Sequence, residues 1–313
     1  MDREFVKICK MTQKELKQHT ALELNAMNRK VTVGNGYVFA KGSFPVCLVA
    51  HLDTVHKELP SKFLYDTTTT TISAPEGIGG DDRCGIYMAL KVAKMYDCSV
   101  LFCEDEEIGM VGAEKFTKSE IAKTLKFNYM IEFDRKGNND AVFYNCDNAD
   151  FEDFITKDFY KYAYGSFSDI STLAPYFKCA AVNLSCGYYN AHTKDEYVVL
   201  KEMYDSISAA CKILERTTEA DAFEYVEAKS YFKKGYGYGY GGWYDYYYDD
   251  YDDDEDDTEH YYIIEYLDED LKTQWWDIVA KSYEEAIGKF CIERPIIPYA
   301  HIVDVCSDDD YLR

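Results

Sequence analysis

Short runs of consecutive apolar residues alternate with helical patterns over the first two thirds of the chain. Runs that are apolar on both faces are typical of strands in a sheet that helices cover on each side. Four such runs predict buried strands, at 46–50, 100–103, 129–133 and 180–184. The pattern therefore indicates a layered α/β domain rather than an all-helical or all-β one.

The segments between these runs predict the helices and one hairpin of the same domain. Helices are expected at 12–27, 83–96 and 200–215. Two short strands, at 31–33 and 37–39, flank Gly34-Asn35-Gly36, which is typical of a tight hairpin turn. Together these elements predict a three-layer fold, a mixed sheet with helices on both faces, over residues 1–217.

The composition changes abruptly after this domain. Residues 236–242 alternate Gly with Tyr, and residues 243–257 are almost entirely Tyr, Asp and Glu. Such a tract repels itself and cannot bury a core, so we expect a disordered linker over 218–258. A small ββαβ module is expected at 259–313, with strands at 261–266, 275–279 and 301–305 and a helix at 282–291.

The charge balance narrows the range of partners. Among 313 residues, 34 are Lys or Arg and 57 are Asp or Glu, a net charge of −23. This surface repels nucleic-acid phosphates and anionic membranes, so we expect neither as a partner. The chain shows no signal peptide and no spanning segment of about 20 apolar residues. Its 11 scattered cysteines include no CxxC pair, which favours reduced thiols and a cytoplasmic protein.

Histidines and carboxylates cluster at the predicted strand ends, where open α/β sheets gather their ligands. His51 follows the first buried run, and Asp53 stands two residues further on, where it can hold the second imidazole nitrogen. Asp81 lies in Gly79-Gly80-Asp81-Asp82-Arg83 at a helix start, and one carboxylate there can bridge two cations. An ordinary N-cap with acidic residues in the first turn is the alternative interpretation of that segment.

Three further positions complete the set. Glu106 and Glu107 stand in the acidic run 104–107 after the second buried strand; a solvated loop is the alternative interpretation of that run. Asp134 ends the third run, and His192 follows the fourth. Two histidines and three carboxylates can hold two divalent ions that share a carboxylate. Mixed nitrogen and oxygen ligands suit Zn²⁺ better than Mg²⁺, although Mn²⁺ or Co²⁺ also fits.

These motifs, in this order, resemble the metal-site motifs of the dizinc exopeptidase clan, which includes peptidase T, acetylornithine deacetylase type enzymes and dizinc aminopeptidases. The matching segments are His51-Leu52-Asp53-Thr54-Val55, Gly80-Asp81-Asp82-Arg83, Glu106-Glu107-Ile108-Gly109, Asp134 and His192-Thr193, and the resemblance spans roughly residues 10–215. It implies one zinc ion on His51, Asp81 and Asp134, and a second on Asp81, Glu107 and His192. It also implies that Asp53 orients His51 and that Glu106 is the general base for a metal-bridging water.

The chain departs from many members of that clan in having no room for a lid. Only 58 positions separate Asp134 from His192, and they must also supply part of the main sheet. We therefore expect an open site, as in the lidless aminopeptidases. Local loops would then contact the substrate, and the candidate residues are Ser168, Asp169, Tyr188, Tyr189 and His56.

The resemblance predicts a metallopeptidase acting on short peptides, most simply an aminopeptidase or dipeptidase. An N-acyl amino acid deacylase of the same fold is an alternative, because the ligands do not set specificity. A non-catalytic binding protein that uses the acidic tail is another, and so is a nucleic-acid mimic. Retention of Glu106 favours an enzyme. The acidic tract and the C-terminal module are candidates for binding a protein partner.

Overall fold

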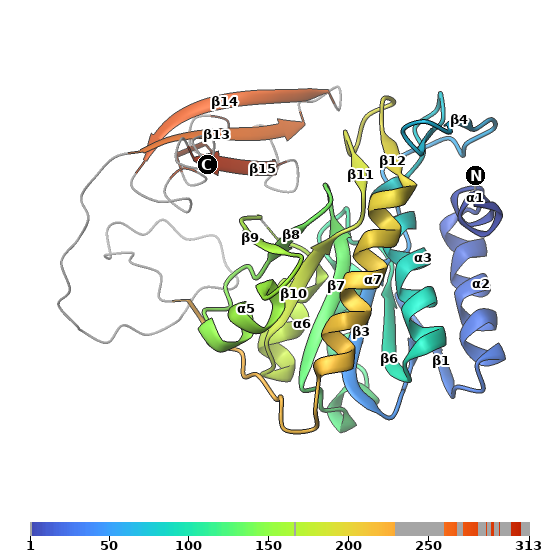
Figure 1. Cartoon of the computed structure of the whole chain (residues 1–313), viewed down its shortest axis with the longest axis vertical. Helices are drawn as coiled ribbons and strands as arrows, with labels where there is room; N and C mark the ends of the chain where they lie inside the picture. The colour runs from blue at the N-terminus through green and yellow to red at the C-terminus, as the bar shows by residue number, and fades with distance from the viewer. Residues whose placement is uncertain are drawn as a thin grey trace.

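The computed structural model describes residues 2–165, 167–228, 260–267, 272–280 and 302–307, with the single residues 286, 289, 290 and 294. Its centre is a mixed eight-stranded sheet in the order β1-β2-β6-β3-β7-β10-β8-β9 (Figure 1). The strands are β1 (Val31–Gly34), β2 (Tyr37–Ala40), β3 (Phe44–His51), β6 (Cys98–Cys103), β7 (Tyr129–Arg135), β8 (Asp140–Val142), β9 (Lys161–Ala163) and β10 (Ala181–Ser185). The central four strands, β6, β3, β7 and β10, run parallel, so their carboxyl ends meet at one edge.

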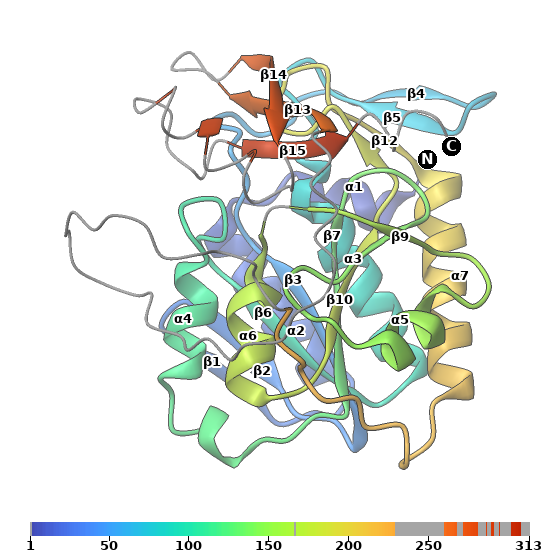
Figure 2. The same ribbon diagram turned by 90° about the vertical axis from the view of Figure 1, so that its left-hand side faces the viewer.

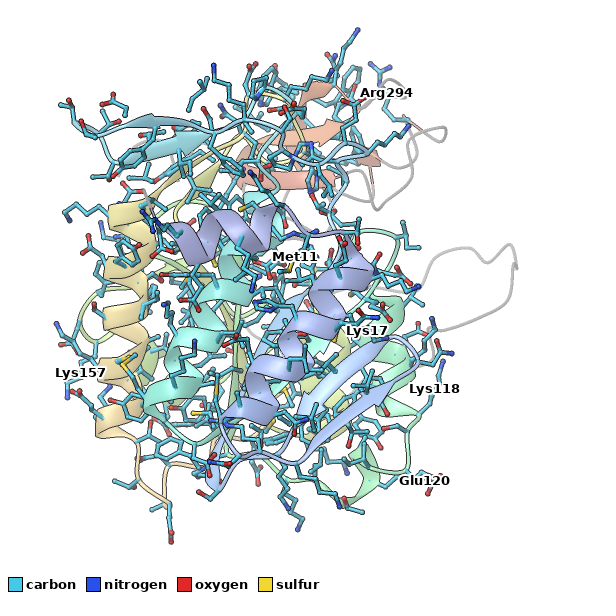
Figure 3. The ribbon with its side chains drawn as sticks, turned by 90° about the vertical axis from the view of Figure 1, so that its right-hand side faces the viewer. Met11, Lys17, Lys118, Glu120, Lys157 and Arg294 are labelled. Atoms are coloured by element: carbon cyan, nitrogen blue, oxygen red, sulfur yellow. The ribbon has the colours of Figure 1, made fainter. Side chains whose placement is uncertain are left out.

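Helices cover both faces of this sheet, which confirms the predicted three-layer fold. One face carries α1 (Arg3–Cys9), α2 (Gln13–Ala26), α3 (Gly80–Met95), α5 (Ala149–Thr156) and α7 (Leu200–Arg216). The other carries α4 (Val111–Thr117) and α6 (Asp169–Phe177), and a short 3-10 helix spans Ala122–Thr124. Figure 2 shows α4 and α6 in front of the strands, and Figure 3 shows α1, α2, α3 and α7 on the opposite side.

The strands are buried on both sides because their side chains alternate between two hydrophobic cores. In β3, Leu48 and Ala50 point to the core beneath α3, whereas Cys47 and Val49 point to the core beneath α4 and α6. This alternation explains why the sequence shows continuous apolar runs rather than a polar-apolar repeat. Nine cysteines between residues 9 and 211 carry free thiols, and eight of them are buried.

A second, four-stranded antiparallel sheet lies next to the carboxyl edge, in the order β11-β12-β5-β4. Its strands are β4 (Leu64–Asp66), β5 (Thr71–Ser73), β11 (Tyr188–Tyr189) and β12 (Tyr197–Val199). The loop between β11 and β12 contains His192. This sheet therefore fixes both ends of that loop.

The interval from Asp134 to His192 forms parts of these two sheets and their helices. It contains β8, α5, β9, α6, β10 and β11. Apart from Ser166, which lies outside the described residues, this accounts for the chain between the two positions without a separate lid domain. The prediction of a lidless fold is confirmed.

Residues 218–228, expected to belong to the disordered linker, instead pack against the domain. Isolated bridges join Glu224 to Cys179 and Glu227 to Cys146. The Phe223 ring packs 5.1 Å from each of the Phe151 and Phe154 rings, measured between centroids. The ordered domain thus extends past 217, because an aromatic residue in this segment fills a gap beside α5. The rest of the expected linker, residues 229–258, lies outside the described residues.

The C-terminal module contains a three-stranded antiparallel sheet in the order β14-β13-β15. Its strands are β13 (His260–Leu267), β14 (Thr273–Ala280) and β15 (Ile302–Ser307). Buried residues of β13 and β14 form a small core with Ala286 and Phe290, which lie where the helix is expected. Most of that helix and His301 fall outside the described residues. Among the described helices, none is long and apolar enough to span a membrane.

Candidate metal centre

Polar side chains from five segments meet where the central strands end. His51 is the last residue of β3, Asp134 lies near the end of β7, and Glu107 stands in the loop after β6. Asp81 lies at the start of α3, and His192 lies in the β11–β12 loop. Parallel neighbouring strands bring the first three together, as the position of ligand sites in open α/β sheets requires.

His51, Asp81 and Asp134 form the first candidate metal group. Their potential ligand atoms all lie within 4.8 Å of one another. His51 Nε2 lies 3.0 Å from Asp81 Oδ1 and 3.3 Å from Asp134 Oδ1. One nitrogen and two carboxylate oxygens therefore point at a common centre.

Asp81, Glu107 and His192 form the second group, with potential ligand atoms again within 4.8 Å of one another. His192 Nε2 lies 3.1 Å from Asp81 Oδ2 and 3.1 Å from Glu107 Oε2. Asp81 thus turns one oxygen towards each histidine. This is the placement that a carboxylate bridging two ions needs.

Some polar atoms of the second group have no hydrogen-bond partner in the protein. Within the described part of the chain, Glu107 Oε1 and both ring nitrogens of His192 are buried without a hydrogen-bond partner, and His192 Nε2 is the nitrogen that faces Asp81 and Glu107. Buried polar atoms are normally paired, so orphaned atoms in a converging nitrogen and oxygen donor set fit a bound transition metal.

The pKa values of the cluster reflect a concentration of negative charge. Burial raises the pKa of both Asp134 and Glu107, and the Asp81 charge raises them further, against the effect of the histidines. Burial alone would lower the pKa of His51, but Asp134, Asp53 and Asp81 raise it well above its ordinary value. The site therefore holds positive charge strongly, as a cation-binding site must.

Asp53 connects His51 to the acidic loop. Its Oδ1 lies 3.3 Å from His51 Nδ1. The backbone N–H groups of Glu106 and Glu107 each donate to this carboxylate over 3.1 Å. Burial acts to raise the pKa of Asp53, but these hydrogen bonds and the His51 charge lower it below its ordinary value. One carboxylate thus orients an imidazole and two consecutive loop residues.

The backbone of the loop that bears Glu106 and Glu107 is sterically constrained. Asp105, Gly109 and Met110 all adopt positive φ angles, of 63°, 108° and 55°. A Cβ atom at Gly112 would lie 2.4 Å from the Gly36 carbonyl oxygen, so a larger residue there would displace the β1–β2 turn. Glu106 itself is only 7 % exposed. The loop backbone is therefore sterically constrained, and it buries Glu106 next to the candidate ligand Glu107.

The residues expected to contact substrate are buried or hydrogen-bonded within the protein. Ser168 is fully buried and donates to Asp134 Oδ2 over 2.8 Å, and Asp169 beside it is also fully buried. Tyr188 is 3 % exposed and donates to the Asp134 carbonyl oxygen over 3.1 Å. Tyr189 donates to Glu202 over 2.5 Å. Ser168 and Tyr188 thus hold Asp134, whereas the prediction that these four residues contact a substrate stays a prediction.

His56 is also bonded within the protein, with its Nε2 lying 2.7 Å from Glu196 Oε2. Glu196 is one of three buried acids near the ligands that the sequence interpretation did not single out; the others are Asp82 and Glu132. Asp82 Oδ2 accepts the His51 backbone N–H over 3.0 Å, and Glu132 stands within an apolar run. A charged residue inside a buried strand was the signal that marked Glu132.

Comparison with known proteins agrees with this geometry. Residues 38–178 match the family model of peptidase family M28, a range that includes each ligand candidate except His192. A search of curated protein sequences finds no significant match.

Solved structures share the fold. Aminopeptidase PepT from Bacillus cereus is similar at 13 % identity over 68 % of this chain and 96 % of its own, with a TM-score of 0.55. An aminopeptidase from the archaeon Desulfurococcus kamchatkensis is similar at 15 % identity over 69 % and 94 %, with a TM-score of 0.54. A Zn-dependent exopeptidase from Parabacteroides distasonis is similar at 13 % identity over 68 % and 95 %, with a TM-score of 0.51.

Proposed function

We propose that this chain is an aminopeptidase acting on short peptides. The premise is that it is a zinc metallopeptidase with a peptidase family M28 domain. The observation that carries the proposal is the Asp81 carboxylate, whose two oxygens lie 3.0 Å and 3.1 Å from the Nε2 atoms of His51 and His192. The names of similar structures, two of them aminopeptidases, support the substrate class.

In this proposal two ions share Asp81. His51 and Asp134 would complete the ligands of one, and Glu107 and His192 those of the other. Two zinc ions held there would polarise the scissile carbonyl and stabilise the charge that develops on its oxygen. The orphaned Glu107 Oε1 and His192 Nε2 support this assignment, because the protein provides neither with a hydrogen-bond partner.

Glu106 is the proposed general base. It stands next to Glu107 in the chain, yet it belongs to neither candidate ligand group. A carboxylate beside the centre but not committed to it is free to take a proton from the attacking water and deliver it to the leaving amine. Asp53 would keep this carboxylate in place, because it accepts the Glu106 backbone N–H.

The test combines metal analysis with an activity panel. The purified chain should hold about two divalent ions and hydrolyse an aminoacyl anilide or a dipeptide. Glu106→Gln should retain the ions and lose turnover by at least about 100-fold, because general acid–base catalysis contributes about that much. Glu114→Gln is the matched control, since Glu114 is an α4 residue paired with Lys118 outside the site.

The panel should also contain N-acyl amino acids. Cleavage of these and not of peptides with a free amino terminus would replace the aminopeptidase proposal with a deacylase. A chain that holds no transition metal and shows no change on His51→Ala would overturn the metal centre itself.

A further inference from the structure

Glu196 is a fully buried carboxylate near the candidate metal centre, and it accepts hydrogen bonds from three donors. Its Oε2 accepts the Gly79 backbone N–H over 2.8 Å and lies 2.7 Å from His56 Nε2. Its Oε1 accepts the Asp81 backbone N–H over 3.0 Å. A buried carboxylate with this many partners is held in a single orientation, and it holds its partners equally firmly.

The turn that Glu196 binds has little freedom to move. Gly77 and Gly79 adopt positive φ angles of 92° and 66°, which favour glycine. A Cβ atom at Gly80 would lie 2.8 Å from Tyr188 Cβ and 3.3 Å from Glu196 Oε1. The backbone that leads into Asp81 is therefore packed directly against Glu196 and β11.

The β11–β12 loop contacts Asp81 from two sides. His192 meets the side chain, with Nε2 3.1 Å from Oδ2, and Glu196, four residues later, holds the backbone N–H of the same residue. His56 contacts the same Glu196 carboxylate and lies in the loop after β3, the strand that ends at His51. The segments bearing His51, Asp81 and His192 are thus joined by one carboxylate outside the ligand set.

We propose that Glu196, held by His56, is a positioning residue that fixes the bridging carboxylate of Asp81 and thereby sets the affinity for the paired ions. This inference rests on the proposed function, in which Asp81 is the shared ligand. Loss of the Glu196 acceptor would free the Gly79–Asp81 backbone. The Asp81 oxygens would then no longer be presented to both histidines at once.

The test compares wild type with Glu196→Gln, which preserves volume but places an amide group opposite backbone donors. Zn²⁺ affinities are measured by competition with a chelator, and the visible absorption spectrum of the Co²⁺-loaded protein reports ligand geometry. We expect roughly 10–100-fold weaker binding of at least one ion, the usual effect of losing a hydrogen bond to a ligand, and an altered Co²⁺ spectrum. Glu202→Gln, which affects a glutamate bonded to Tyr189 and not to Asp81, is the control and should change neither.

His56→Gln provides a second variant if Glu196→Gln does not fold, and we expect a weaker shift in the same direction. Affinities within twofold of wild type and an unchanged Co²⁺ spectrum, in whichever of these variants folds, would overturn the positioning role alone. That result would leave the proposed function intact, provided that wild type binds two ions. A wild-type chain that binds no divalent ion would overturn the proposed function and this inference together.

Discussion

At the scale of single residues, Asp53 links one proposed metal ligand to the loop that bears the proposed general base. It holds His51 through Nδ1 and receives the backbone N–H groups of Glu106 and Glu107. An imidazole ligand needs its second nitrogen fixed in this way, and a general base needs a fixed backbone. Both requirements depend on a carboxylate, because an amide offers only one acceptor oxygen.

Replacing Asp53 by Asn should therefore lower kcat by roughly 10–100-fold, since one of the two loop N–H groups loses its acceptor. The measurement is steady-state hydrolysis of the best substrate, with metal content determined on the same samples. Asp66→Asn is the matched control, because Asp66 accepts the Thr68 N–H on the exposed β4. Equal kcat values for Asp53→Asn and wild type would contradict the linking role.

The sequence predicted which residues would meet, because histidines and carboxylates are common metal ligands and several of them follow predicted strands. It did not predict the hydrogen bonds around them. Ser168 and Tyr188, named as substrate contacts, both donate to Asp134. Sequence spacing fixes where a residue stands along the chain, whereas the direction of its side chain depends on packing that arises only when the sheets assemble.

At the scale of elements, α1 depends on one capping residue. Asp2 Oδ1 accepts the backbone N–H groups of Glu4 and Phe5, over 2.8 Å and 2.9 Å. Its Oδ2 accepts the hydroxyl groups of Tyr87 on α3 and Tyr204 on α7, each over 2.8 Å. The sequence pattern did not predict α1, because seven residues are too few to show a helical period. A side chain thus joins three helices that are distant in sequence.

Asp2→Asn should lower the free energy of unfolding by about 1 kcal/mol at neutral pH. Partial burial acts to raise the pKa of Asp2, but the hydrogen bonds from Phe5, Tyr87 and Tyr204 lower it below 3.8. The stabilisation is therefore complete above the unfolded-state pKa and disappears as the pH falls through the folded-state value. Urea unfolding of both proteins at pH 7 and at about pH 3 measures this. A difference that grows towards acid pH would contradict the prediction.

At the scale of the whole molecule, the ordered catalytic domain ends later than the sequence predicts. The sequence predicts an end at 217, because the last helical pattern of the domain stops there. Phe223 nevertheless completes an aromatic cluster with Phe151, Phe154 and Tyr129, and its backbone pairs with Asn128 and Ala180. The segment is too short and too mixed in composition to show a periodicity, so only the packed structure reveals that Phe223 and Tyr225 contact the core.

Two truncations test this boundary. A chain ending at residue 228 should keep the melting temperature and activity of the domain, whereas one ending at 217 should lose about 3 kcal/mol of stability, as buried Phe→Ala changes do. Phe223→Ala in the full chain is the matched point variant and should account for most of that loss. Equal unfolding curves for the two truncations would show that residues 218–228 contribute nothing.

The order in which the ligand segments occur along the chain has a consequence for biosynthesis. His51 and His192 lie at opposite ends of the catalytic domain's sequence, and the three carboxylates of the proposed centre stand between them. At about 5–20 residues per second, roughly 7–30 s separate the synthesis of the two histidines. The proposed ligands of the first ion, His51, Asp81 and Asp134, are all synthesised before His192, so only the second ligand set stays incomplete during that interval. Acquisition of the second ion would then be the later event, and the cellular supply of exchangeable zinc would reach that position only after the β11–β12 loop has been made.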